Sequence, residues 1–230
     1  MRFDIITIFP KIFDSYFNES IIKRAQKKRK IKINVVNLRN FATDKHKTVD
    51  EKPYGGGAGV VLMTEPLIKA VDYVKKSGKN KKIKIVVLSV KGKQFNQKTA
   101  YNWAKKYDRI IFITGRYEGI DERVKTILKA DEISIGPYIT MDGDVAVMVI
   151  ISALTRLIPN VINWNSLKDE SFLRKIISRE AKTGELEYPH YTRPEVIKYK
   201  NKKYAVPKVL LSGNHKKIEE WRKKHQKENL

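Results

Sequence analysis

Short apolar runs rich in isoleucine and valine alternate with amphipathic segments from the start of this 230-residue chain up to Leu157. Continuous apolar runs of this kind are typical of strands that are buried on both faces of a parallel sheet. The amphipathic segments repeat at helical spacing, and helices between strands provide the crossovers that a parallel sheet requires. We therefore expect an α/β domain. The expected strands are residues 3–8, 31–36, 83–88, 110–113 and 133–135, and the expected helices are residues 18–28, 65–76, 96–106 and 120–130.

The sequence also indicates where one helix begins and that no segment spans a membrane. Thr64 is expected to be the N-cap of helix 65–76, with Pro66 in its first turn. The amino-terminal stretch MRFDIITIFP is too short and too interrupted for a signal peptide or a membrane span. The run VAVMVIISAL, residues 145–154, lies between Asp144 and Arg156 and has the length of a core helix. We expect no membrane association and a cytoplasmic location.

Charge and cysteine content narrow the possible functions. A formal net charge of +23 and a pI near 9.9 predict a polyanionic partner, with nucleic acid favoured over an acidic membrane. Lysine and isoleucine are both abundant, so biased codon usage is an alternative source of part of this charge. The chain has no cysteine, which excludes disulfides, thiolate zinc sites and cysteine nucleophiles.

The alternating pattern stops in the last third of the chain. Residues 158–172 contain a proline and three asparagines without a sustained period, which is typical of a linker. We therefore expect a domain at residues 1–160, a flexible linker at 161–175 and a small basic domain at 176–230. In the latter, KVLLSG (208–213) resembles a strand, and Asn214 is expected to cap a basic helix with Ile218 and Trp221 facing inward.

Glycine-rich segments suggest sites but do not match common nucleotide motifs. The sequence lacks a phosphate loop of the P-loop type and an HExxH motif. The segment YGGGAGVVL, residues 54–62, does not lead from a strand into a helix as a dinucleotide-binding loop would. It is either a turn that needs positive φ or a loop that contacts a polyanion. The nearby side chains slightly favour the second interpretation: Lys45, His46, Lys47 and Lys52.

Polar or glycine-containing loops follow three of the expected strands, at residues 88–92, 114–119 and 134–144. Ligands of parallel sheets bind outside the carboxyl ends of the strands, so these loops predict one crevice for a small ligand. Loops of parallel sheets also need glycine and serine for their turns, and the residues alone do not identify the ligand. On the residues alone, Asp169 is a linker cap rather than a general base, and Arg156 extends a charged end from an apolar helix into solvent.

Several motifs together resemble one family over essentially the whole chain. TVDEKPYGGGAG, ITGRYEGIDERV, KDESF, YPHYTRPEV and VLLSGNHKKIEEWR occur in family order and are similar to the bacterial tRNA (guanine-N(1))-methyltransferases of the SPOUT class. The resemblance implies a parallel sheet with a deep trefoil knot, an exception to the rule that chains are un-knotted, together with a small, mainly helical carboxyl-terminal domain. It also implies an active homodimer. Without the partner subunit, residues 120–124 would expose apolar area.

The resemblance assigns roles to individual residues. It implies that S-adenosylmethionine binds in the loops that the strand pattern indicates. It makes Asp169 the base that takes the N(1) proton of guanine, and Arg156 the donor to the charge that develops on O6. The implied cofactor-binding residues are Leu88, Ser89, Gly115, Tyr117, Glu118, Ser134, Ile135, Gly136, Pro137, Tyr138, Ile139, Thr140 and Gly143. The residues expected to contact RNA are His46, Asp50, Gly55, Gly56, Gly57, Gly59, His190, Arg193, Asn214 and Arg222.

One loop departs from the family pattern. The family usually reads I-G-D-Y-V-L-S-G-G-E-L-P here, and Val90 replaces a usual proline. The departures that matter most are Pro137 for Asp, Met141 for Ser, Asp142 for the first paired Gly, Asp144 for Glu and Ala146 for Pro. An aspartate in place of glycine at position 142 predicts a costly positive φ and a changed cofactor affinity.

Two functions are therefore weighed. The first is a methyltransferase acting on the guanosine that follows the anticodon of tRNA, with S-adenosylmethionine as cofactor and a divalent cation such as magnesium as a further requirement. The second is a basic RNA-binding protein that keeps the scaffold but has weakened or lost methyl transfer. The intact KDESF motif and Arg156 favour the first. A DNA partner is not expected in either.

Overall fold

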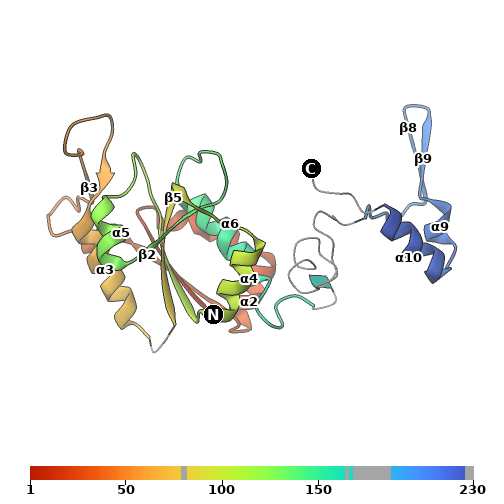
Figure 1. Ribbon diagram of the computed structural model, residues 1–230, viewed down its shortest axis with the longest axis horizontal. Coiled ribbons are helices and arrows are strands. Elements are labelled where there is room, and N and C mark those ends of the chain that lie inside the picture. The colour runs from red at the N-terminus through yellow and green to blue at the C-terminus, as the bar shows by residue number, and fades with distance from the viewer. Residues whose placement is uncertain (79–81, 164–165, 168–187, 226–230) are drawn as a thin grey trace. The chain divides into compact units, whose positions relative to one another are not determined.

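The computed structural model describes residues 1–78, 82–163, 166–167 and 188–225, and it divides into two compact units, Met1–Ile162 and Asn163–Leu230. The first unit is built on a five-stranded sheet of order β2-β1-β6-β5-β7, in which every neighbouring pair is parallel (Figure 1). The expected α/β fold with a parallel sheet is thereby confirmed. The strands are β1 (Arg2–Thr7), β2 (Lys32–Asn37), β5 (Ile83–Gln94), β6 (Arg109–Ile113) and β7 (Asp131–Ser134).

Helices cover both faces of this sheet (Figure 1). One buried apolar cluster joins the sheet to α2, α4 and α6, and a second joins it to α3 and α5. This two-sided burial explains why the strand sequences are apolar without alternation. The helical segments are η1 (Pro10–Phe13), α1 (Asp14–Phe17), α2 (Ser20–Lys27), η2 (Leu38–Phe41), α3 (Thr64–Lys76), α4 (Gln97–Lys106), α5 (Glu122–Leu128) and α6 (Gly143–Thr155).

Some local expectations are confirmed and others are wrong. The apolar run 145–154 lies within α6, as predicted, and packs in the core. Helix α3 begins at Thr64 itself, so Met63 occupies the cap position and Thr64 is not the cap. Asp142 has φ −166°, which is extended backbone, because it is the N-cap of α6 and accepts hydrogen bonds from the amides of Asp144 and Val145. The positive φ expected at this position is therefore wrong.

Strand β5 runs past the predicted end at Leu88. Its residues Leu88 and Lys93 both pair with Ile133 of β7, so the residues between them bulge out of the ladder. A Cβ on Gly92 would lie 2.4 Å from the amide nitrogen of Ile133, and only glycine fits this approach. A short antiparallel pair, β3 (Asp50–Glu51) and β4 (Val61–Leu62), brackets the glycine loop in a region that was expected to lack strands. The trefoil knot itself stays a prediction.

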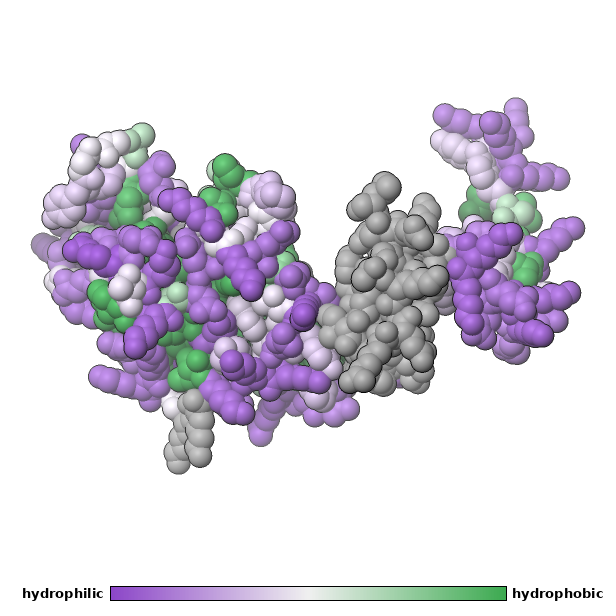
Figure 2. Space-filling model, viewed as in Figure 1, coloured by the Kyte–Doolittle hydropathy of each residue, from purple (hydrophilic) through white to green (hydrophobic). Residues whose placement is uncertain are grey.

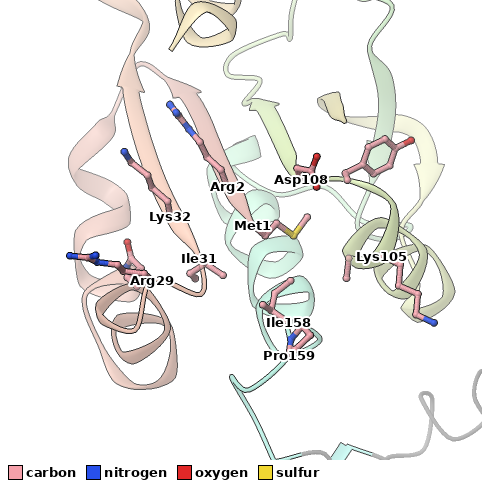
Figure 3. Close-up of a pocket in the computed structure, with 12 residues that line it drawn as sticks. Met1, Arg2, Arg29, Ile31, Lys32, Lys105, Asp108, Ile158 and Pro159 are labelled. Atoms are coloured by element: carbon pink, nitrogen blue, oxygen red, sulfur yellow. The ribbon is translucent and has the colours of Figure 1, made fainter. Parts of the chain in front are cut away.

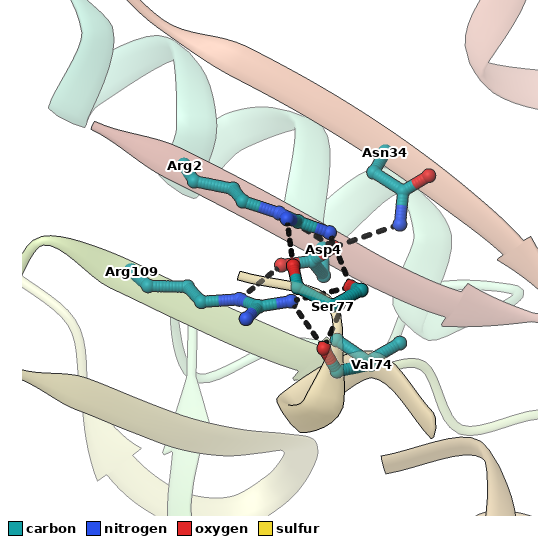
Figure 4. Close-up of polar contacts among 6 residues, drawn as sticks. All are labelled: Arg2, Asp4, Asn34, Val74, Ser77 and Arg109. Carbon is teal, nitrogen blue, oxygen red and sulfur yellow. Dashed lines mark hydrogen bonds and ion pairs between the residues drawn. The ribbon is translucent and has the colours of Figure 1, made fainter. Parts of the chain in front are cut away.

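A buried polar network holds the amino ends of the central strands together (Figure 4). Asp4 on β1 and Arg109 on β6 are both fully buried, and Nε of Arg109 lies 2.6 Å from Oδ2 of Asp4. Arg2 and Asn34 donate to the other carboxylate oxygen of Asp4 at 2.7 Å. Nη2 of Arg109 donates to the carbonyl of Val74 at the end of α3. Burying these charges is tolerated because each has a partner of opposite charge and further hydrogen bonds.

The described part of the second unit contains a hairpin and two helices. Strands β8 (Val196–Tyr199) and β9 (Lys202–Ala205) pair antiparallel, and α9 (Lys208–Leu211) and α10 (His215–Lys224) follow. The expected strand at 208–213 is wrong. The strands that pair in the described part of this unit are β8 and β9, whereas local backbone hydrogen bonds close residues 208–211 into the turn of α9. Asn214 caps α10 as predicted, and Ile218 and Trp221 are the half-buried side chains of α10.

Within the residues that the structure describes, no helix is long and apolar enough to cross a membrane. Most of the predicted linker 161–175 lies outside the described residues.

Candidate active site

A cleft of about 280 Å³ lies at the carboxyl ends of β5, β6 and β7. It is walled by the bulge of β5, the loop from β6 to α5 and the loop from β7 to α6, so the three predicted loops meet as the strand pattern indicated. Of the residues expected to bind the cofactor, only Gly136 and Pro137 do not line the cleft. Those that do are Leu88, Ser89, Gly115, Tyr117, Glu118, Ser134, Ile135, Tyr138, Ile139, Thr140 and Gly143.

Main-chain groups form the closest part of the wall. The amide of Gly143 donates to the carbonyl of Gly115 at 2.9 Å. A Cβ on Gly143 would lie 2.8 Å from the Gly115 nitrogen, so a side chain is excluded there. Gly136 lies under the ring of Tyr138, where a Cβ would come within 2.3 Å of the ring. The loop after β6 and the start of α6 therefore meet, within the cleft lining, at a distance that only glycine permits at position 143.

Arg116 joins two of the cleft loops. Its guanidinium lies 2.7 Å from Oδ2 of Asp144 and 3.0 Å from Oδ2 of Asp142, and it stacks over the ring of Phe9 at 4.6 Å. Asp144 is fully buried, and its Oδ1 has no hydrogen-bond partner. Arg116 is therefore the main compensation for that buried charge, and it holds the start of α6 against the loop after β6.

The cleft is lined by many carboxylates although the chain as a whole is basic. The carboxylates in its lining are Glu118, Asp121, Glu122, Glu132 and Asp142. The hydrogen bond from the Arg123 side chain lowers the pKa of Asp121 to about 2. Burial raises the pKa of Glu132, but hydrogen bonds from Ser89 and Lys125 outweigh it and leave that pKa below its ordinary value. These two carboxylates are therefore ionised at neutral pH, and each has a cationic partner, Arg123 or Lys125. The carboxylates of the lining outnumber its basic side chains, which are Lys91, Arg116 and Lys125, so the cleft is acidic on balance.

The glycine loop is attached to the cleft by backbone bonds. The amide of Glu118 donates to the carbonyl of Val60, and the amide of Leu62 donates to the carbonyl of Gly119. The turn needs the conformational freedom that was expected, since four glycines have positive φ: Gly55, Gly56, Gly57 and Gly59. These glycines and His46 are exposed, while Asp50 is half-buried in β3. The glycines expected to contact RNA thus lie on a loop that is held in place by the loop between β6 and α5, which lines the cleft.

Of the two predicted catalytic residues, the structure describes only Arg156, which does not line the cleft. Asp169 is outside the described residues. Arg156 is half-buried and follows the last turn of α6, whereas Gly143 of the cleft begins that helix. At 1.5 Å per residue, roughly 20 Å of helix separates them. Within one chain, the structure therefore does not bring Arg156 to the cleft.

The predicted RNA-contacting residues of the second unit lie around α10. His190 and Arg193 are exposed, and Asn214 uses its side chain to accept from the amide of Lys217 at the helix start. The guanidinium of Arg222 stacks on Tyr188 at 4.8 Å. Figure 2 shows hydrophilic side chains over most of the visible face of this unit.

Sequence reasoning overlooked Arg116, Asp142 and Asp144 as a group. Their charges were visible in TGRYEG and in MDGD, but only the fold shows that the two segments are adjacent. No group of three His, Asp or Glu side chains in the described ranges is placed to hold a metal ion.

Comparison with known proteins matches the whole chain to one family. A family model described as tRNA (Guanine-1)-methyltransferase TrmD matches residues 1–230. The chain is 48% identical to a tRNA (guanine-N(1)-)-methyltransferase of Carboxydothermus hydrogenoformans, over 97% of this chain and 82% of that protein. It is 46% identical to the enzyme of Anoxybacillus flavithermus, over 97% and 86%, and 45% identical to that of Mycoplasma mycoides, over 98% and 87%.

We predict that Arg116→Gln lowers the free energy of unfolding by about 3 kcal/mol, because it leaves the buried Asp144 without a counter-charge. Urea denaturation at pH 7 measures the change. Arg123→Gln is the matched control, since Arg123 is 67% exposed and solvent screens its pair with Asp121, so its loss should change the free energy of unfolding much less. Equal losses in the two variants would show that Arg116 does not stabilise the cleft in this way.

Proposed function

Because the chain belongs to the tRNA (guanine-N(1))-methyltransferase family, we propose that it transfers a methyl group from S-adenosylmethionine to N(1) of the guanosine that follows the anticodon of tRNA. The family makes it a tRNA methyltransferase that uses S-adenosylmethionine, and the position of the guanosine is the proposed refinement. The observation that carries the proposal is the cleft at the carboxyl ends of β5, β6 and β7.

The residues of the cleft fit S-adenosylmethionine. The ligand has an ammonium and a sulfonium group, and the carboxylates of the cleft complement this positive charge. The main chain lines the cleft at Gly115 and Gly143, where no side chain intrudes. When bound, S-adenosylmethionine supplies a methyl group on a positively charged sulfur that leaves as a neutral thioether.

The chemistry at guanine requires the removal of the N(1) proton. As the bond from N(1) to the methyl carbon forms and the bond from carbon to sulfur breaks, we assign the proton to the carboxylate of Asp169. Arg156 is assigned to the negative charge that builds on O6. Both assignments rest on the family motifs. Since Arg156 lies about 20 Å of helix away from Gly143, we propose that it serves the cleft of a partner subunit.

A homodimer is the natural way to complete such a site. The expected exposure at residues 120–124 is wrong, because Val124 is fully buried and Ile120 packs against the same core cluster. Another surface offers apolar area instead. Ile139 is 87% exposed and Met141 94%, and Figure 2 shows hydrophobic side chains at the tip of the loop before α6.

This apolar surface continues along one side of α6. Val145 and Val149 are four residues apart, so they share a face of the helix, and both are exposed. Ser152, three residues further, accepts a hydrogen bond from the exposed Tyr16. We propose that this face is the surface on which two copies associate.

Three further parts of the proposal rest on the family and on charge. The second unit supplies phosphate contacts to tRNA through the basic side chains of α10: Lys216, Lys217, Arg222, Lys223 and Lys224. A divalent cation such as magnesium is required for full activity. The protein acts in the cytoplasm.

We predict that Asp169→Asn slows methyl transfer by about two to four orders of magnitude, because the amide cannot accept the N(1) proton. Single-turnover rates measure this on a tRNA with guanosine after the anticodon, and calorimetry shows that S-adenosylmethionine affinity stays near wild type. Asp72→Asn on α3 is the matched control and leaves the rate unchanged. A decrease of less than about tenfold would return Asp169 to a structural role.

The same calorimetry separates the two candidate functions. An RNA-binding scaffold that has lost methyl transfer would give no heat with millimolar S-adenosylmethionine, and a methyltransferase gives a saturable signal.

We predict that Val149→Glu converts the dimer into a monomer, because it places a charge in the apolar surface along α6. Sedimentation equilibrium then gives the chain mass of 26.7 kDa instead of twice that value. Ile127→Glu is the control, since Ile127 is 55% exposed on α5 over the opposite face of the sheet. A wild-type protein that is active and monomeric would refute the dimer.

A further inference from the structure

A second hollow, of about 860 Å³, lies at the amino ends of the strands, at the edge of the sheet opposite the cleft (Figure 3). Its lining comes from the starts of β1 and β2, from the residues before β6 and from the end of α4. Ile31 and Ile158 are almost fully buried at its base. None of the residues assigned above to the cofactor, to RNA or to catalysis lines it.

Positive charge dominates this hollow. Arg29, Lys32 and Lys105 line it and are exposed. Among the described residues, none of these three side chains forms an ion pair with a carboxylate. Asp108 is the acidic side chain of the lining, and its carboxylate already accepts from the amide of Lys82 at 3.3 Å. The basic side chains of the described lining therefore outnumber its one carboxylate, which favours an anionic ligand.

The backbone at Arg29 supports a role for its side chain. Arg29 has φ +53°, in the left-handed region, where the chain turns from α2 into β2. This position after a helix usually carries glycine, because a side chain is disfavoured in left-handed backbone. The turn is fixed by the bonds from the amides of Arg29 and Lys30 to the carbonyls of Gln26 and Ala25. An arginine at a strained position suggests a functional reason for its retention.

The lining identifies which part of an RNA would bind. Tyr107 is the aromatic residue of the lining, and its ring lies beneath the ammonium groups of Lys84 and Lys106 at 5.2 and 5.4 Å. A nucleobase therefore finds no free aromatic ring for stacking in the described lining. Charge without stacking is suited to backbone phosphates, which proteins bind without reading the sequence.

We propose that this hollow binds phosphates of the tRNA backbone at a distance from the methylated guanosine, with Arg29 and Lys32 as the contacting residues. The proposal rests on the proposed function for the identity of the RNA. The five residues of β6 span about 16 Å between this edge of the sheet and the cleft. The contact thus contributes affinity for tRNA and takes no part in the chemistry at N(1).

The test uses the full-length chain with Arg29→Asn and Lys32→Gln combined. Asparagine accepts left-handed backbone more readily than arginine, so the turn is preserved. The control combines Lys76→Gln and Lys98→Gln, which remove two exposed lysines of the same unit that form no ion pair with any residue the structure describes. The dissociation constant of a tRNA transcript with guanosine after the anticodon is measured across salt concentrations, together with the rate at saturating tRNA.

The double variant should bind tRNA about tenfold more weakly, and the slope of log affinity against log salt should become shallower by about 2, as expected for two lost phosphate contacts. The rate at saturating tRNA and the control variant should match wild type. An unchanged tRNA affinity and slope would overturn the proposal. The proposal would also be overturned if the wild type bound ATP and the double variant did not, while the two bound tRNA equally well. The ligand would then be a small phosphorylated molecule. A wild-type protein that binds tRNA with this charge dependence but forms no methylated guanosine would refute the proposed function and leave this inference standing.

Discussion

The parallel alignment of the five strands is the constraint on which the rest of the structure depends. It gives the sheet two chemically different edges, since all carboxyl ends meet at one and all amino ends at the other. The buried pair of Asp4 and Arg109 fixes the amino ends of β1 and β6, which ties the register of the central strands to a specific charge pairing. A strand shifted by one residue would separate these charges inside the core, at a cost of several kcal/mol.

The two edges of the sheet carry side chains of opposite charge. At the carboxyl edge, carboxylates line a cleft in an otherwise basic chain, and the main chain approaches closely at Gly115 and Gly143. A cation of limited size suits that environment. At the amino edge, basic side chains outnumber the one carboxylate in the described lining of a larger hollow, which suits a polyanion. This separation suits a protein that binds a small cationic cofactor and a large anionic substrate, because each ligand is attracted to a different surface.

Sequence patterns predicted the parts of this arrangement that depend on local order. The apolar runs located every strand of the parallel sheet, and the loops after three of them predicted the cleft before any ligand was considered. The contacts of Arg116 with Asp142 and Asp144 could not be predicted, because they join segments whose adjacency is a property of the fold. The aspartate at position 142 looked costly when only its backbone was considered. As the N-cap of α6 it stabilises the helix start. Segment 208–213 has strand-like residues but contains helix α9. No strand in the described residues pairs with it, and strand propensity depends on such pairing.

The role proposed for the cleft at the carboxyl edge is methyl transfer to N(1) of guanosine. The most direct measurement incubates the purified chain with S-adenosylmethionine carrying a labelled methyl group and with two tRNA transcripts, which differ only in having guanosine or adenosine after the anticodon. The transcripts are then digested, and mass spectrometry identifies the labelled nucleoside. The account predicts 1-methylguanosine from the first transcript and no label in the second. Bound S-adenosylmethionine without any 1-methylguanosine, or equal labelling of both transcripts, would contradict it.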